Sequence, residues 1–165
     1  MSRLDSFIAR MQAQRDCLNW LAPAIRALPG PLLEVGLGNG RTYDHLRELF
    51  PGREIHVFER KVAAHPDCIP PDDRLFLGEA RETLARAARQ LGPTAALIHT
   101  DLGTGDTAAN RAMADWLAPA LAQLAAPGGY VLANQSLDVA AWQRLPEPAG
   151  VPRDRYFLYR AAPSS

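Results

Sequence analysis

The chain has 165 residues, with 18 basic and 18 acidic side chains and therefore no formal net charge. A hydrophobic fraction of 47% and a charged fraction of 22% are typical of a folded globular protein rather than a disordered one. The balanced charge lacks the basic footprint of a nucleic-acid binder, and the length suits one domain, residues 1–165, but not two.

The first segment, residues 1–28, has the pattern of a helix. Its apolar residues recur at three- and four-residue steps, Ser2 with Asp5 matches a capping box, and Pro23 is expected to kink or divide the helix. The simplest interpretation is a helix packed on the domain; a homodimer contact and a lid over the site are the alternatives. Charges interrupt the segment every few positions, so we predict no signal peptide, no membrane partner and a cytoplasmic location.

Short apolar runs alternate with helical stretches across residues 31–161, which we interpret as the α/β core. This alternation predicts a doubly wound fold, in which a mainly parallel sheet is covered by helices on both faces. Strands are expected at residues 32–36, 54–59, 74–77, 95–101 and 129–134. Helices are expected at residues 41–50, 80–91 and 107–125, the last broken near Pro119. The sequence RYFLYRA at residues 155–161 predicts one more strand, antiparallel and at an edge.

Three glycines at alternate positions follow the first predicted strand, in PLLEVGLGNG. In doubly wound sheets ligands bind at the carboxyl ends of the strands, and Gly36, Gly38 and Gly40 would let the backbone approach one closely. Free N–H groups at the start of the next helix would favour an anionic group there. A dinucleotide fingerprint needs G-x-G-x-x-G, and counting from Gly36 or Gly38 the third position holds Arg41 or Tyr43.

The observed pattern, E-x-G-x-G-x-G from Glu34, resembles the first motif of class I S-adenosylmethionine-dependent methyltransferases. Three later segments resemble further elements of that family, in the same order. They are VFER at residues 57–60, LFLGEARETL at residues 75–84 and LAAPGGYVLA at residues 124–133. The whole chain, with its N-terminal helix and shortened C-terminus, is similar to a small bacterial methyltransferase family. The resemblance implies a Rossmann-like fold, S-adenosyl-L-methionine as cofactor and methyl transfer to an acceptor.

The resemblance also implies which residues bind the cofactor. The glycine turn would surround it, the acid that ends the second strand would bind both ribose hydroxyls, and the third element would lie beside the adenine. The residues so assigned are Glu34, Gly36, Gly38, Gly40, Glu59, Arg60, Gly78, Glu79 and Ala80.

Three of these acids have plainer interpretations. Glu34 could contact the ammonium group of the cofactor indirectly, or could accept N–H groups of the glycine turn as a strand-end carboxylate. Glu59 could be a surface acid paired with Arg60 or Lys61, and Glu79 could simply complement a helix dipole.

Catalytic candidates come from IHTDLGTGD at residues 98–106, the end of the fourth predicted strand. His99 and Asp101 are two residues apart, so their side chains share a face. Methyl transfer is an in-line displacement that mainly needs positioning, with a base only where the acceptor must lose a proton. Asp101 is the first candidate for a base or acceptor-orienting group and His99 the second. His99 as an interior histidine and Asp106 as a helix N-cap are the plainer interpretations.

No metal site is predicted. Asp101 with Asn134 resembles part of the magnesium site of catechol-type O-methyltransferases, but Ala133 stands where that family has an acid. The two cysteines, Cys17 and Cys68, lack the spacing of a zinc site or a disulfide framework.

A small-molecule acceptor is the expected partner, with nucleic acid excluded and a homodimer possible. Trp116 and Trp142 could line the acceptor pocket or, at helical spacing, belong to the core. Two other functions stay open on the sequence: a cofactor-binding module without turnover, and an NAD-dependent oxidoreductase, for which no Tyr-Lys pair is evident.

Overall fold

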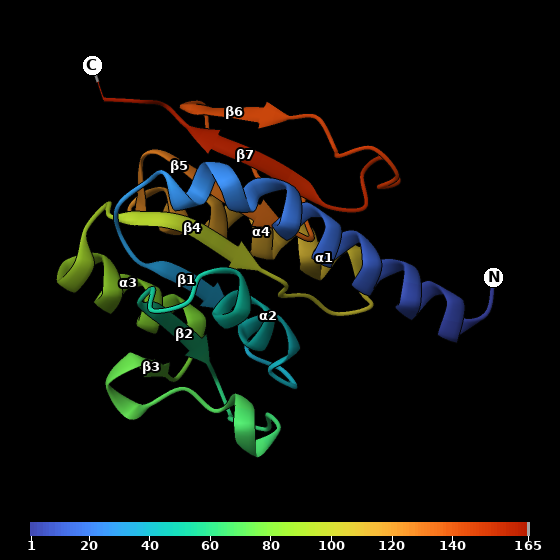
Figure 1. Cartoon of the computed structure of the whole chain (residues 1–165), viewed down its shortest axis with the longest axis horizontal. Helices are drawn as coiled ribbons and strands as arrows, with labels where there is room; N and C mark the ends of the chain where they lie inside the picture. The colour runs from blue at the N-terminus through green and yellow to red at the C-terminus, as the bar shows by residue number, and fades with distance from the viewer. Residues whose placement is uncertain (165) are drawn as a thin grey trace.

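A seven-stranded sheet runs through the centre of the computed structural model, which describes residues 1–164 (Figure 1). The strand order is β3-β2-β1-β4-β5-β7-β6. The first five strands are parallel to one another, β7 is antiparallel to β5, and β6 is antiparallel to β7. The strands are β1 (Leu32–Val35), β2 (Ile55–Glu59), β3 (Leu75–Leu77), β4 (Ala95–Thr100), β5 (Ala125–Ala133), β6 (Trp142–Leu145) and β7 (Phe157–Ala161). The sheet is the mainly parallel one predicted, with the antiparallel strand β7 added beyond β5.

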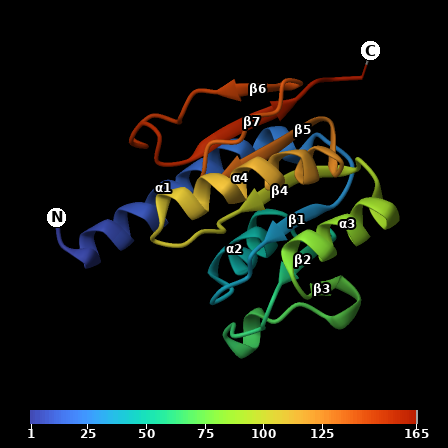
Figure 2. The same ribbon diagram turned by 180° about the vertical axis from the view of Figure 1, so that it is seen from behind.

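Four α-helices cover the sheet on its two faces (Figures 1 and 2). They are α1 (Arg3–Arg26), α2 (Arg41–Leu49), α3 (Ala80–Leu91) and α4 (Thr107–Ala122), and two single 3₁₀ turns, Pro66–Cys68 and Asp72–Arg74, lie between β2 and β3. The doubly wound Rossmann-like fold is therefore confirmed. None of the helices in the described part of the chain is long and apolar enough to cross a membrane.

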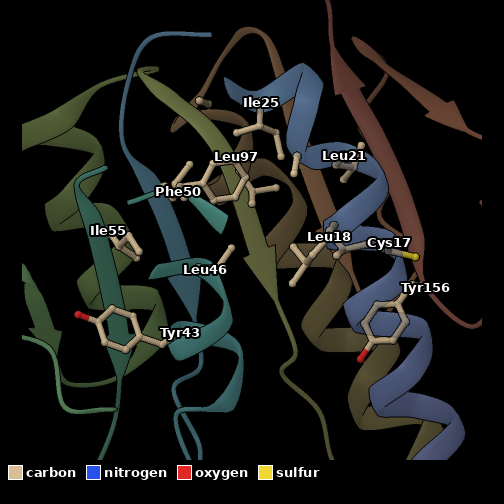
Figure 3. Close-up of a cluster of buried hydrophobic side chains, with 14 of the residues drawn as sticks. Cys17, Leu18, Leu21, Ile25, Tyr43, Leu46, Phe50, Ile55, Leu97 and Tyr156 are labelled. Atoms are coloured by element: carbon tan, nitrogen blue, oxygen red, sulfur yellow. The ribbon is translucent and has the colours of Figure 1, made fainter. Parts of the chain in front are cut away.

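The alternation of side chains along β1 explains the two layers. Leu32 points into a cluster with α1 and α2, part of which Figure 3 shows, whereas Leu33 and Val35 point into a second cluster with α3 and α4. All four residues of β1 are buried, as expected for a central parallel strand. Glu34 shares its face with Leu32, so its carboxylate lies on the side of α1.

Both helices that contain a proline are continuous, and the predicted break near Pro119 is wrong. α1 runs undivided through Pro23 to Arg26, and α4 runs through Pro119 to Ala122. Each proline lacks the N–H that would bond to the carbonyl four residues earlier, but only three helical residues follow it. A buried residue two positions after each proline, Ile25 in α1 and Leu121 in α4, holds the last turn on the sheet.

The remaining differences concern the edge of the sheet. β5 begins at Ala125, earlier than predicted, because an irregular first part pairs with β4 before the register shifts between Ala95 and Leu97. The expected edge position of β7 is wrong, because β6, which was not predicted, lies beyond it. All four residues of β6 are partly or fully exposed, so its sequence lacks the apolar alternation of an inner strand.

Candidate functional site

Two adjoining cavities lie at the carboxyl ends of β1, β2 and β4. Cavity A, of about 560 Å³, is bounded by the ends of β1 and β2, the start of α3, the loop after β4 and Trp116 of α4. Cavity B, of about 330 Å³, is bounded by α1, the turn after β1, the start of α2 and Asp101. Gly36, Glu59 and Leu102 line both, so the cavities are two chambers of one cleft.

The three glycines of the turn after β1 have different physical roles. A β-carbon at Gly40 would overlap that of Cys68, so packing requires glycine there. One at Gly36 would lie 2.9 Å from Cδ2 of Leu102, a side-chain end that can move, so the left-handed backbone, with φ +96°, is the stronger reason for glycine at that position. At Gly38 a β-carbon would meet no atom within 4 Å, yet the backbone is left-handed, with φ +52°. Because Gly38 lines cavity B, any side chain at this position would occupy ligand space rather than protein interior.

Glu59, at the end of β2, holds the glycine turn in place. Its Oε2 accepts hydrogen bonds from the N–H groups of Leu37 and Gly38 at 2.9 and 3.1 Å, and its Oε1 accepts those of Arg60 and Lys61 at 2.8 and 3.1 Å. The carboxylate is thus bound by four backbone donors rather than by basic side chains. Glu59 fixes the shape of the wall that divides the two cavities.

Glu34 and His99 form a buried pair on neighbouring strands. They are register partners in β1 and β4, and Nδ1 of His99 lies 2.7 Å from Oε2 of Glu34. The other ring nitrogen, Nε2, lies 2.9 Å from Nε2 of Gln14 on α1. The N–H groups of the glycine turn bind Glu59 instead, so the interpretation of Glu34 as their acceptor is wrong.

The pair favours its protonated forms. Burial raises the pKa of the Glu34 carboxyl, and the opposing attraction of His99 does not cancel that effect. Burial disfavours a charge on His99, but the carboxylate of Glu34 and the charge of Asp101 outweigh it and raise the pKa of the imidazole. Both shifts mean that the folded pair releases its protons at a higher pH than the two separate side chains would.

Asp101 follows β4 and is bound from α1. Nη1 of Arg10 lies 3.0 Å from Oδ2 and 3.3 Å from Oδ1 of Asp101, and Nε2 of Gln14 lies 3.5 Å from Oδ2. The structure thus brings His99 and Asp101 together through Gln14. His99 is fully buried, whereas the Asp101 side chain is 17% exposed and lines cavity B.

Arg10 and Gln14 belong to the site but were not predicted from the sequence. Gln14 is buried, with 5% exposure, on the face of α1 that packs on the sheet. The signal in the sequence for Gln14 as a site residue was its polar side chain within the apolar repeat of that helix, between Met11 and Leu18.

The residues assigned to the adenine side line cavity A. Gly78, Glu79 and Ala80 lie at the start of α3, and Gly78 donates its N–H to the carbonyl of Glu59. Glu79 occupies the N-cap of α3 without a side-chain hydrogen bond to the helix, and it lies 4.0 Å from Arg60 with both side chains exposed.

The two tryptophans have different surroundings. Trp116 lines cavity A, where the guanidinium of Arg81 lies 4.7 Å from its ring centroid. Trp142, on β6, packs against Tyr159. Trp116 therefore lines the same cavity as Gly78, Glu79 and Ala80, the residues predicted to lie beside the adenine.

The described residues form no group of three or more His, Cys, Asp or Glu side chains that could hold a metal ion. The Asn134 amide donates to the carbonyl of Leu102, and Asp106 caps α4 through the N–H groups of Ala108 and Ala109, as predicted.

Comparison with known proteins agrees with this geometry. Residues 1–161 match a family model described as S-adenosyl-L-methionine methyltransferase. The crystal structure of an S-adenosyl-L-methionine methyl transferase from Silicibacter pomeroyi DSS-3 is 44% identical, with a TM-score of 0.93 over 98% of this chain and 99% of that one. A search of curated protein sequences gives no significant match.

Two more distant structures share the fold. The Escherichia coli protein yhhF is 17% identical, with a TM-score of 0.65 over 93% of this chain and 88% of that one. Human methyltransferase-like protein 13, solved in complex with S-adenosylhomocysteine, is 17% identical, with a TM-score of 0.54 over 97% of this chain and 81% of that one.

Proposed function

Because the chain belongs to the S-adenosyl-L-methionine methyltransferase family, we propose that it methylates a small-molecule acceptor beside Asp101. The methyl donor is S-adenosyl-L-methionine. The proposal assigns the adenosine part of the donor to cavity A and its methionyl part to cavity B.

The residues of the cleft fit this donor. Cavity A has the volume of a small-ligand site, and its lining joins the aromatic ring of Trp116 to the polar groups of Glu59 and Glu79. Cavity B has the left-handed Gly38 on its wall, where a β-carbon would take ligand space. The carboxylate of Glu59 lies where the cavities meet, beside the place proposed for the ribose. Because its two oxygens already accept four backbone N–H groups, we propose that it shapes the turn around the ribose rather than binding both hydroxyls.

Asp101 is the proposed acceptor-orienting residue. It lines cavity B, keeps part of its surface exposed and is held by Arg10, so its carboxylate has a fixed position from which to orient an acceptor. Neither cavity is lined by His99, which is sealed behind Gln14, so we propose it as a positioning residue rather than a catalytic one.

The donor supplies an activated methyl group, whose bond to sulfur breaks with its electron pair staying on sulfur as the acceptor atom bonds to the carbon. This chain's residues then act by position: Glu59 fixes the turn, Gly38 admits the ligand and Asp101 orients the acceptor. On one side the chamber is bounded by α1, through Arg10 and Met11.

The observation that carries the choice of a small acceptor is that α1 bounds the reacting end of the cleft. Cavity B is a chamber of about 330 Å³ between α1 and the sheet, much of which the methionyl group of the donor would fill. The balanced charge of the chain also offers no attraction to nucleic acid. A homodimer stays a prediction.

The test is to incubate the purified protein with methyl-labelled S-adenosylmethionine and with separate small-molecule, protein and RNA fractions of a bacterial extract. Label should enter the small-molecule fraction and should fall at least about 10-fold with Asp101→Ala, as expected for a lost positioning contact. Transfer into protein or RNA alone would overturn the choice of acceptor class.

A further inference from the structure

Gln14 of α1 connects the buried pair of Glu34 and His99 to the carboxylate that lines cavity B. Its Nε2 lies 2.9 Å from Nε2 of His99 and 3.5 Å from Oδ2 of Asp101. The Gln14 side chain is 5% exposed, and His99 is fully buried. One amide nitrogen therefore faces both a ring nitrogen and a carboxylate, with one of its two hydrogens available for each.

This arrangement specifies where the His99 ring carries its hydrogen. Because the NH₂ group of Gln14 only donates, Nε2 of His99 has to offer its lone pair. The ring hydrogen is then on Nδ1, which donates to Oε2 of Glu34 at 2.7 Å. Asp101 has two donors in this state, the amide of Gln14 and the guanidinium of Arg10.

One more proton on the buried pair reverses the polarity of Nε2. An imidazolium carries hydrogen on both nitrogens, and a neutral ring that accepts at Nδ1 from a protonated Glu34 carries its hydrogen on Nε2. In both cases Nε2 of His99 becomes a donor, whichever side chain holds the added proton. Two donors then face each other, and a hydrogen bond forms only if the amide rotates by half a turn and presents Oε1 of Gln14.

The rotated amide would change the surroundings of Asp101. The two ends of an amide have nearly the same shape, so the rotation needs no space beyond that of the side chain. An oxygen would then occupy the place beside Oδ2 of Asp101 that the structure gives to a nitrogen. The carboxylate would lose one donor, meet a repelling oxygen and keep only Arg10.

We propose that Gln14 is a positioning residue that transmits the protonation of the buried pair to Asp101. Its amide holds the carboxylate when Nε2 of His99 is bare and releases it when Nε2 carries a hydrogen. The inference rests on the proposed function, in which Asp101 orients the acceptor.

The other groups that face these side chains do not titrate near neutral pH. On β5 the register partner of His99 is the apolar Leu132. Arg10, from α1, stays charged. Burial, and then the charge of Asp101, raise the pKa of the Tyr156 phenol beside β7, so this group stays neutral. A response of Asp101 near neutral pH would therefore come from the buried pair.

Nuclear magnetic resonance of the isotope-labelled protein tests the proposal without knowledge of the acceptor. A titration from pH 5 to pH 9 follows the ring nitrogens of His99, the side-chain amide of Gln14 and the carboxyl carbon of Asp101. All three should change with one midpoint. Above it, the amide hydrogens should show a strong nuclear Overhauser effect to the carbon-bound hydrogens of the His99 ring, and below it a weak one.

Gln14→Leu removes the amide and keeps a side chain of similar size. His99 should still titrate, but the change at Asp101 should become at least about 3-fold smaller, because only the charge of the pair then acts across the gap. A smaller reduction overturns the proposal, since charge acting through space would account for the response. A His99 ring that keeps one state from pH 5 to pH 9 overturns it as well.

Gln12→Leu is the matched control, because Gln12 is also on α1 but is exposed and lines neither cavity. It should leave all three titrations as in the wild type. If Gln14→Leu does not fold, the wild type decides: an Overhauser effect between Gln14 and His99 that is constant through the titration overturns the proposal. Failure of the proposed function would appear separately, as a wild type that titrates as described but transfers no methyl group to small molecules.

Discussion

Arg10 and Asp101 are 91 residues apart in the chain, yet Nη1 of the arginine lies 3.0 Å from Oδ2 of the aspartate. The contact joins the N-terminal helix to the end of β4. Together with Gln14, which reaches both His99 and Asp101, it makes α1 a wall of the cleft. The helix therefore has a role beyond packing on the sheet.

Removing either member of this ion pair should loosen the N-terminal half of α1. Arg10→Gln and Asp101→Asn are each expected to lower the free energy of unfolding, with a coupling of about 1 kcal/mol in a double-mutant cycle, because the pair is only partly buried. Urea denaturation of the two single variants and the double variant measures the coupling. A coupling of zero would mean that the arginine does not hold the carboxylate.

Gly38→Val should abolish binding of S-adenosylhomocysteine while the protein still folds. The β-carbon would enter cavity B, and the left-handed backbone adds roughly 1–2 kcal/mol of strain. Gly52→Val is the matched control: Gly52 is also left-handed, with φ +76° and open space around it, but it lines neither cavity. Both variants should lose similar stability, and only the first should lose calorimetric binding.

Glu59→Gln should weaken both the fold and the cofactor site. A glutamine presents an NH₂ group to two of the four N–H donors that the carboxylate accepts, so these donors lose their partner. We expect a loss of about 1–3 kcal/mol in the free energy of unfolding and at least about 10-fold weaker S-adenosylhomocysteine binding. Glu79→Gln, with no side-chain bond to its helix, should change the stability little.

The stability of the protein should fall as the pH rises above the ordinary pKa values of the buried pair. Glu34 and His99 both have a pKa raised above the ordinary 4.5 and 6.5, so the folded state binds more protons than the unfolded chain does. Their contribution is complete below those values and is lost as the pH passes the raised ones.

Urea denaturation between pH 5 and pH 9 measures this slope. In Glu34→Gln the carboxylate that raises the pKa of His99 is gone, so the pH dependence should flatten while the overall stability drops by a few kcal/mol, as for a broken buried pair. A slope equal to that of the wild type would show that Glu34 does not raise the pKa of His99.

The sequence predicted the parts of the fold that depend on local pattern. The apolar runs of β1, β2 and β4 and the helical repeats of α1 and α3 identify elements that the sheet then buries on both faces. The prediction of a break at Pro119 was wrong because helix propensity ignores the buried residues that hold the last turn of α4 on the sheet. β6 was not predicted because a partly exposed edge strand needs no alternation of apolar residues in its sequence.

The site was predictable where it follows from the ends of strands. The places of Gly38 and Glu59 follow from the rule that ligands bind at the carboxyl ends of parallel strands. The partners from α1 could not be assigned, because nothing in the chain between Arg10 and Asp101 specifies that they meet; only the packing of α1 across β4 and β5 determines it.

Trp116 should report donor binding by fluorescence. It is one of three tryptophans, and it is the one that lines cavity A, whereas Trp20 and Trp142 line neither cavity. An adenine bound against its ring would change its emission, and Arg81, 4.7 Å from the ring centroid, would have to adjust. Adding S-adenosylhomocysteine should therefore quench or shift the emission of the wild type.

Trp116→Phe should remove this signal while calorimetry still detects binding, weakened by no more than about 10-fold for one lost stacking contact. A signal that persists in Trp116→Phe, or that disappears only in Trp142→Phe, would place the adenosine outside cavity A.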